Sequence, residues 1–135
     1  MPPARVRLIL ADDHEESLNE LANLLAGEFE ITGIARDGTQ LVDLAESLRP
    51  DVVVTDLQMP ELNGIEAARA LLARRLCTAV VITTVYGDPQ LARTALEAGV
   101  HGYVLKVNAS EDLIPAINLA LCGKTFVSAE IWPDY

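Results

Sequence analysis

The stretch VVVTDLQMPELNG, residues 52–64, places an apolar run directly against the carboxylate of Asp56 and follows it with a loop that carries Pro60 and Gly64. A Val-Val-Val-Thr run is typical of a strand that is buried on both faces. A charge at the tip of such a strand is costly unless a nearby group offsets it. Asp56 therefore either has partners from elsewhere in the chain or is a surface residue at the start of a loop.

Short apolar runs alternate with longer stretches of helical spacing along the chain. The runs, which are rich in Val and Ile, predict strands at residues 6–11, 30–35, 52–55, 79–84 and 102–106. Apolar residues at helical spacing predict helices over 18–25, 41–48, 67–74, 88–99 and 110–123, the last with Ser110 as its N-cap. Strands and helices that alternate in this way form a parallel sheet covered on both faces. The sequence therefore predicts a single doubly wound α/β domain.

Composition narrows the possible classes of function. The 135 residues carry 20 acidic and 10 basic side chains, a net charge of −10, which disfavours binding of nucleic acid by this segment. Cys77 and Cys122 show no Cys-x-x-Cys spacing and are expected to be free thiols. His14 and His101 show no metal-ligand spacing and are expected at the surface or at caps. Because there is neither an apolar run of about 18 residues nor a signal-peptide layout, we expect a soluble cytoplasmic protein without membrane contact.

Polar side chains follow four of the five predicted strands. In chain order they are Asp12 and Asp13, Asp56, Thr83 and Thr84, and Lys106. The carboxyl ends of parallel strands meet at one edge of the sheet, where doubly wound folds bind ligands. Three carboxylates there repel one another unless a cation or a phosphoryl ligand is present. Carboxylate oxygens suit Mg²⁺, and a carboxylate beside Mg²⁺ can attack phosphorus to form an aspartyl phosphate, with Lys106 and a threonine hydroxyl on the phosphoryl oxygens.

These residues make the chain resemble the receiver domain of bacterial two-component response regulators. The resemblance rests on LILADDH (8–14), DLQMPELNG (56–64), the threonine that ends VVITT (80–84) and the lysine of GYVLK (102–106). It implies a flavodoxin-like (βα)5 fold with the strand order 2-1-3-4-5, which the apolar pattern alone does not predict. It also implies a signalling switch rather than an enzyme, in which Asp56 accepts a phosphoryl group from a sensor histidine kinase.

The resemblance further implies roles for individual residues. Mg²⁺ would be held by the carboxylates of Asp13 and Asp56 and by the backbone carbonyl of Gln58, with Asp12 close by. Thr84 is preferred over Thr83 as the switch hydroxyl, because its interval to Lys106 and the following loop VYGDP (85–89) fit the family better. Tyr103 matches the aromatic residue that moves inward when that threonine reorients. Two further positions, two residues past Asp56 and Thr84, match residues that tune the lifetime of the phosphate: Gln58 and Tyr86.

One departure from the family pattern points to a subfamily. Many receivers have Pro after the lysine, whereas Val107 follows Lys106 here. With ALEAGVHGYVLK (95–106) and AINLALCGKTFVSAEI (116–131), this resembles the receivers that precede a LuxR-type helix-turn-helix DNA-binding domain. We therefore expect a receiver domain over residues 1–124 and a tail or the start of a linker over 125–135, with transcription regulated through a DNA-binding domain outside this chain. A stand-alone receiver is the alternative, and GKTFVSAEI (123–131) favours the linker.

The same resemblance implies surfaces through which the protein would contact partners. Phosphorylation would change the face built from the helix at 88–99, the strand at 102–106 and the helix at 110–123. A homodimer would use that face or pair the helices at 18–25 and 110–123.

Other functions are weighed against the phosphorylated receiver. A pseudo-receiver that binds partners without phosphorylation stays open as an alternative. A flavin carrier is disfavoured by the carboxylates of ADDHEES (11–17), and an aspartyl phosphatase by Gln58, which stands where a second acid would follow Asp56.

Overall fold

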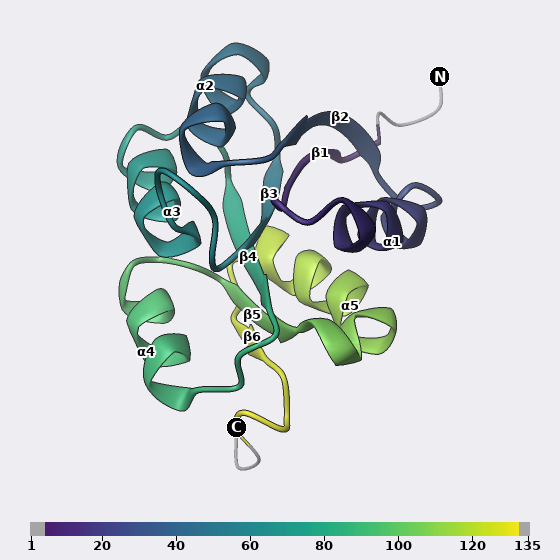
Figure 1. Cartoon of the computed structure of the whole chain (residues 1–135), viewed down its shortest axis with the longest axis vertical. Helices are drawn as coiled ribbons and strands as arrows, with labels where there is room; N and C mark the ends of the chain where they lie inside the picture. Colours follow the sequence, from purple (N-terminus) through teal and green to yellow (C-terminus); the bar gives the residue numbers. More distant parts are fainter. Residues whose placement is uncertain (1–4, 133–135) are drawn as a thin grey trace.

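A six-stranded parallel sheet forms the centre of the computed structural model, which describes residues 5–132 (Figure 1). The strands are β1 (Arg7–Ala11), β2 (Glu30–Ala35), β3 (Val52–Asp56), β4 (Ala79–Thr84), β5 (Gly102–Leu105) and β6 (Phe126–Val127). They lie in the order β2-β1-β3-β4-β5-β6, which confirms the expected order 2-1-3-4-5 and adds a short sixth strand at the β5 edge. That sixth strand was not predicted, since two residues are too few to show a strand period.

Five helices cover the two faces of the sheet. They are α1 (Glu15–Leu25), α2 (Gly38–Leu48), α3 (Gly64–Ala73), α4 (Pro89–Glu97) and α5 (Ala109–Leu121). Helices α1 and α5 lie on one side, and α2, α3 and α4 lie on the other (Figure 1). No helix within residues 5–132 is long and apolar enough to cross a lipid bilayer.

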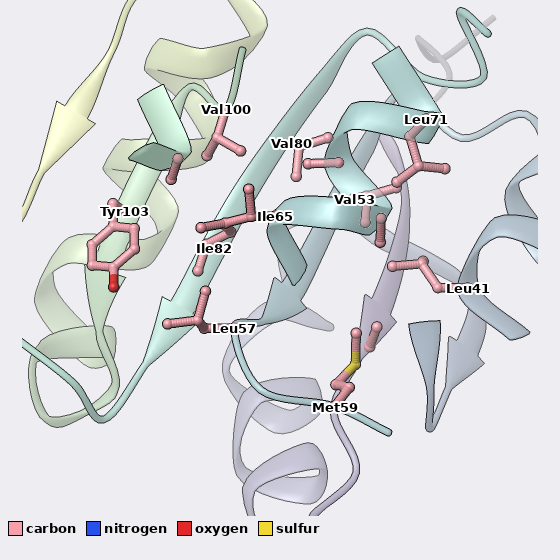
Figure 2. Packing of buried hydrophobic residues seen from close by; sticks show 14 of the residues in the cluster. Leu41, Val53, Leu57, Met59, Ile65, Leu71, Val80, Ile82, Val100 and Tyr103 are labelled. Carbon is pink, nitrogen blue, oxygen red and sulfur yellow. The ribbon is translucent and has the colours of Figure 1, made fainter. Parts of the chain in front are cut away.

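Alternating side chains of the strands build two separate cores. In β1, Leu8 and Leu10 face α1 and α5, whereas Ile9 faces the other helices. The larger core lies under α2, α3 and α4, where Leu41, Leu71 and residues of β3 and β4 interdigitate (Figure 2). Because the strands are buried on both faces, they read as continuous apolar runs, as expected for a parallel sheet.

The end of β5 differs from the sequence prediction. The strand stops at Leu105, and Lys106 begins a 3₁₀ turn, η1 (Lys106–Asn108). Helix α5 then starts at Ala109 with Asn108 in the N-cap position, so the assignment of Ser110 as the N-cap was wrong. The 3₁₀ turn runs directly into the helix, because the N–H of Ala109 already donates to the carbonyl of Lys106. Ser110 is thereby inside the first helical turn.

Two glycines hold the loop between β3 and α3 in place. The N–H of Gly64 donates to the Leu57 carbonyl at 2.7 Å, and a Cβ on Gly64 would overlap the carbonyl oxygen of Asp56. The N–H of Gly38 donates to the Pro60 carbonyl at 3.3 Å, and a Cβ there would overlap the backbone of Leu62. The loop that follows Asp56 is therefore clamped against the starts of α2 and α3, where only glycine leaves room.

Candidate functional site

Three charged side chains from three strand ends converge at the carboxyl edge of the sheet. The Nζ atom of Lys106 lies 2.7 Å from Oδ2 of Asp12 and 3.3 Å from Oδ2 of Asp56. Asp12 and Asp56 are buried, and the lysine side chain is 16% exposed. The cation therefore bridges two carboxylates that are separated from it by 94 and 50 positions of sequence, as the strand-end pattern predicted.

Asp12 is the more strongly anchored of the two carboxylates. Its Oδ1 accepts the N–H of His14 at 2.9 Å, and its Oδ2 accepts the hydroxyl of Ser17 at 2.8 Å in addition to Lys106. Burial alone raises the pKa of Asp12, but these donors outweigh it and leave the pKa below its ordinary value. Asp12 is thus held as a carboxylate by the fold.

Asp56 stands in the opposite electrostatic situation. Its Oδ1 accepts the Leu57 N–H at 2.8 Å, and Lys106 lies farther from it than from Asp12. Burial raises the pKa of Asp56, Lys106 offsets this only in part, and the neighbouring charge of Asp12 raises it further. Of the two buried carboxylates, Asp56, the residue that ends β3, is therefore the less compensated.

Asp13 and His14 complete a cluster of candidate metal ligands. Asp12, Asp13, His14 and Asp56 each present a ligand atom within 4.8 Å of the others. Nδ1 of His14 lies 3.1 Å from Oδ1 of Asp13, and its side chain is 71% exposed. His14 occupies the N-cap position of α1 without capping it through its side chain. It is a surface residue as expected, but the sequence prediction missed its place beside the Asp12-Asp13 pair.

The second histidine lies in a different environment from the one expected. His101 is partly buried, and its Nδ1 has no hydrogen-bond partner among the residues that the structure describes. Burial lowers the pKa of His101. The side chain is therefore neither a cap nor a fully solvated residue, and it lies outside the acidic cluster.

The two adjacent threonines of β4 face opposite sides of the sheet. Oγ1 of Thr84 accepts the N–H of Tyr86 at 3.0 Å, on the side that also holds the fully buried Tyr103 (Figure 2). The Tyr103 hydroxyl donates to the Tyr86 carbonyl at 3.4 Å; burial raises its pKa to about 12, and a hydrogen bond with Thr84 opposes that rise. Thr83 pairs with Asp56 in the strand ladder, and its buried Oγ1 has no partner within residues 5–132. The geometry thus links Tyr103 to Thr84 rather than to Thr83.

Gln58 and Tyr86 stand at the mouth of the site. The Tyr86 hydroxyl donates to Oε1 of Gln58 at 3.3 Å, and both side chains are exposed. They line a pocket of about 590 Å³ that Asp56 and Lys106 also line. A hydrogen-bonded pair of exposed polar side chains thus shares this pocket with the buried carboxylate.

Comparison with known proteins identifies the family. A family described as the response regulator receiver domain matches residues 8–118, a range that contains the acidic cluster and Lys106. The chain belongs to this receiver family. It is thus a signalling switch of two-component systems rather than a catalytic enzyme, as the resemblance implied.

Individual relatives support the same assignment. The chain is 39% identical over 116 residues to the transcriptional regulatory protein PdtaR of Mycobacterium tuberculosis, covering 85% of this chain and 56% of that protein. It is 34% identical over 128 residues to the nitrate/nitrite response regulator NarL of Escherichia coli, covering 93% and 59%. This receiver therefore spans little more than half the length of these relatives.

A solved structure supports the expected subfamily. The crystal structure of a LuxR-family two-component response regulator from Aurantimonas sp. superposes with a TM-score of 0.88 at 29% identity. The superposition covers 97% of this chain and 95% of that one. The predicted resemblance to receivers of the LuxR type is thereby confirmed.

Proposed function

We propose that this receiver is switched by phosphorylation of Asp56, with a sensor histidine kinase as the source of the phosphoryl group. The observation that carries the proposal is the bridge from Lys106 to both Asp12 and Asp56 at the carboxyl edge of the sheet. It holds a cation beside a buried carboxylate whose charge is under-compensated. Such a carboxylate needs a further cation before it can react with an anionic phosphodonor.

The donor set around Asp56 fits Mg²⁺. Carboxylates of Asp12, Asp13 and Asp56 each present an oxygen within 4.8 Å of the others, and Mg²⁺ prefers such hard oxygen ligands. We infer that the carboxylates of Asp13 and Asp56 bind the ion directly, together with the backbone carbonyl of Gln58. Asp12, which pairs with Lys106, would lie close to the ion. When bound, the ion would neutralise charge on the phosphoryl oxygens.

The reaction follows from the placement of the chain's own groups. A carboxylate oxygen of Asp56 attacks phosphorus, and the bond from phosphorus to the kinase histidine nitrogen breaks, so that the electron pair leaves with the imidazole. Lys106, already between the two carboxylates, pairs with one phosphoryl oxygen. The Thr84 hydroxyl turns to another, giving up its bond with the Tyr86 N–H. Tyr103 is coupled to this motion through Thr84 and Tyr86.

The lifetime of the phosphate would be set at the mouth of the pocket. The contacting pair Tyr86 and Gln58 would restrict the approach of water to phosphorus on Asp56, because both side chains line the pocket that Asp56 lines. Breaking that contact exposes the acyl phosphate to hydrolysis. We infer that these two side chains tune the duration of the signal.

The output proposed for the receiver is control of transcription. The relatives named above are transcriptional or nitrate/nitrite response regulators, and this chain matches only part of each. We propose a receiver over residues 1–124 and a connecting segment over 125–135, whose first residues form β6. DNA would be bound by a LuxR-type domain outside this chain. Homodimerisation would use the α4–β5–α5 face or α1 with α5.

Intact-mass measurement tests the proposed chemistry. The protein is incubated with Mg²⁺ and acetyl phosphate beside Asp56→Asn and beside Asp43→Asn, which removes an exposed carboxylate of α2. Wild type and Asp43→Asn should each gain one phosphoryl group that hydroxylamine removes, whereas Asp56→Asn should gain none. If wild type gains nothing from acetyl phosphate or from a panel of histidine kinases, the chain is a pseudo-receiver. If Asp56→Asn gains a phosphoryl group, the acceptor is a residue other than Asp56.

A further inference from the structure

The segment after α5 returns along the open edge of β5. Val127 of β6 pairs with Tyr103 of β5, and the N–H of Ser128 donates to the Tyr103 carbonyl at 3.1 Å. Ile131 is buried in the same core cluster as Tyr103. The segment from Phe126 to Ile131 thus covers the strand that leads into Lys106.

At the end of the β5–β6 ladder, the side chain of Ser128 accepts a hydrogen bond that a backbone carbonyl would otherwise accept. In a parallel ladder the next acceptor for the Leu105 N–H would be the Ser128 carbonyl. That carbonyl is taken by a turn, because it accepts the N–H of Ile131 at 2.9 Å. The Leu105 N–H donates instead to Oγ of Ser128 at 3.1 Å.

The hydroxyl of Ser128 also donates a hydrogen bond to α5. Because Oγ accepts from Leu105, its O–H donates to Oδ2 of Asp112 at 2.9 Å, in the first turn of α5. Ser128 is completely buried, so water cannot replace either bond. One side chain therefore ties the end of β5, the end of β6 and the start of α5 together.

We propose that Ser128 is a positioning residue for the phosphorylation site. Leu105 directly precedes Lys106, and its other neighbour in the sheet is Thr84 of β4. The hydrogen bond from the Leu105 N–H to Ser128 fixes the backbone of this last β5 residue on the side away from β4. It thereby sets where the Lys106 side chain leaves the sheet. The 2.7 and 3.3 Å contacts of its Nζ depend on that exit point. The inference about phosphorylation rate rests on the proposed function; the inference about Lys106 does not.

Four variants separate positioning from simple attachment of the segment. Ser128→Ala removes the acceptor for Leu105, and Ser128→Thr keeps a hydroxyl at that place. Ile131→Ala is the matched control, because it loosens the same segment through a buried apolar side chain and touches no hydrogen bond of the network. Asp112→Ala removes the acceptor of the Ser128 proton, together with one acidic charge of the first turn of α5, and serves if Ser128→Ala does not fold.

The first readout is the ¹H–¹⁵N signal of the Lys106 ammonium group, which reports its ion pairs without any phosphodonor. We expect this signal to shift or broaden in Ser128→Ala, to return toward wild type in Ser128→Thr and to stay unchanged in Ile131→Ala. Asp112→Ala should move it in the same direction as Ser128→Ala. The proposal is overturned if the Lys106 signal is unchanged in folded Ser128→Ala and Asp112→Ala. It is also overturned if Ile131→Ala changes the signal as much as they do.

The second readout is the rate of phosphorylation by acetyl phosphate with Mg²⁺. Since small misplacements of a catalytic group are costly, we expect a loss of about 3- to 10-fold in Ser128→Ala, with recovery in Ser128→Thr. Ile131→Ala should stay within about 2-fold of wild type by the same reasoning. If wild type takes no phosphoryl group from acetyl phosphate or from the kinase panel, the proposed function fails, and the Lys106 signal alone decides the role of Ser128. A wild-type rate in Ser128→Ala together with an altered Leu105 amide signal overturns positioning.

Discussion

Replacing Lys106 by methionine isolates the energetic role of the buried bridge. The substitution keeps an unbranched side chain of similar length and removes the only cation that contacts both Asp12 and Asp56 in the described residues. Two carboxylates then lie together in a buried site without that cation, and only their hydrogen bonds to His14, Ser17 and Leu57 remain. We expect the variant to fold but to lose stability at neutral pH.

The magnitude follows from the two distances. With an effective dielectric constant of about 20, Coulomb's law gives roughly 6 kcal/mol for charges 2.7 Å apart and roughly 5 kcal/mol at 3.3 Å. Desolvation of the ammonium group opposes this by several kcal/mol, so the net loss should be about 3–5 kcal/mol, as is usual when one partner of a buried ion pair is removed. Domains typically have about 5–15 kcal/mol of stability, and one in the middle or upper part of that range survives that loss.

Urea denaturation as a function of pH is the assay. In wild type the folded-state pKa of Asp12 lies below its ordinary 3.8, so its contribution is present above that value and lost as pH falls through the lowered pKa. The pKa of Asp56 is already raised, and loss of Lys106 raises it further. The gap between wild type and Lys106→Met should therefore be largest near neutrality and close in acid.

A double-mutant cycle with Asp12→Asn supplies the control. In the Asp12→Asn background, Lys106→Met should cost less by at least about 1 kcal/mol, because one of the two carboxylates is already neutral. Mg²⁺ should stabilise Lys106→Met more than wild type, since it binds a site with more uncompensated negative charge. A Lys106→Met variant as stable as wild type at every pH would refute the view that the bridge compensates buried charge.

Three further predictions concern the surrounding fold. Gly64→Ala should destabilise by about 1–3 kcal/mol in urea, because its Cβ would overlap the Asp56 carbonyl, whereas Gly27→Ala, with open space around it, should not. Asn63→Ala should cost about 1 kcal/mol through loss of the α3 capping box, and an unchanged urea midpoint would contradict this. His101→Gln should flatten the pH dependence of stability just below pH 6.5. The lowered folded pKa of the wild-type imidazole makes the unfolded state protonate first, so that stability falls as the pH drops. A wild-type pH profile in this variant would show that the histidine stays hydrated.

The sequence predicted those features of the fold that depend on residues close together along the chain. The continuous apolar runs marked the five main strands of a parallel sheet, and the residues after them marked one edge. Asp12, Asp56 and Lys106 could be grouped because strand ends meet at that edge whatever the detailed packing. The N-cap of α5 was misplaced by two residues, since Ser110 is a good capping residue but the preceding 3₁₀ turn already places the N-cap at Asn108.

What the sequence by itself determined is the alternation of buried strands and amphipathic helices, and with it the edge to which the acidic and basic groups belong. Only the tertiary structure decided that Lys106 lies closer to Asp12 than to Asp56, and that His14 joins the cluster. Only packing, too, brings Ser128 to the end of β5. The physical reason is that periodicity reports which face of an element is buried, whereas ion-pair distances and a two-residue strand depend on partners far away in the chain.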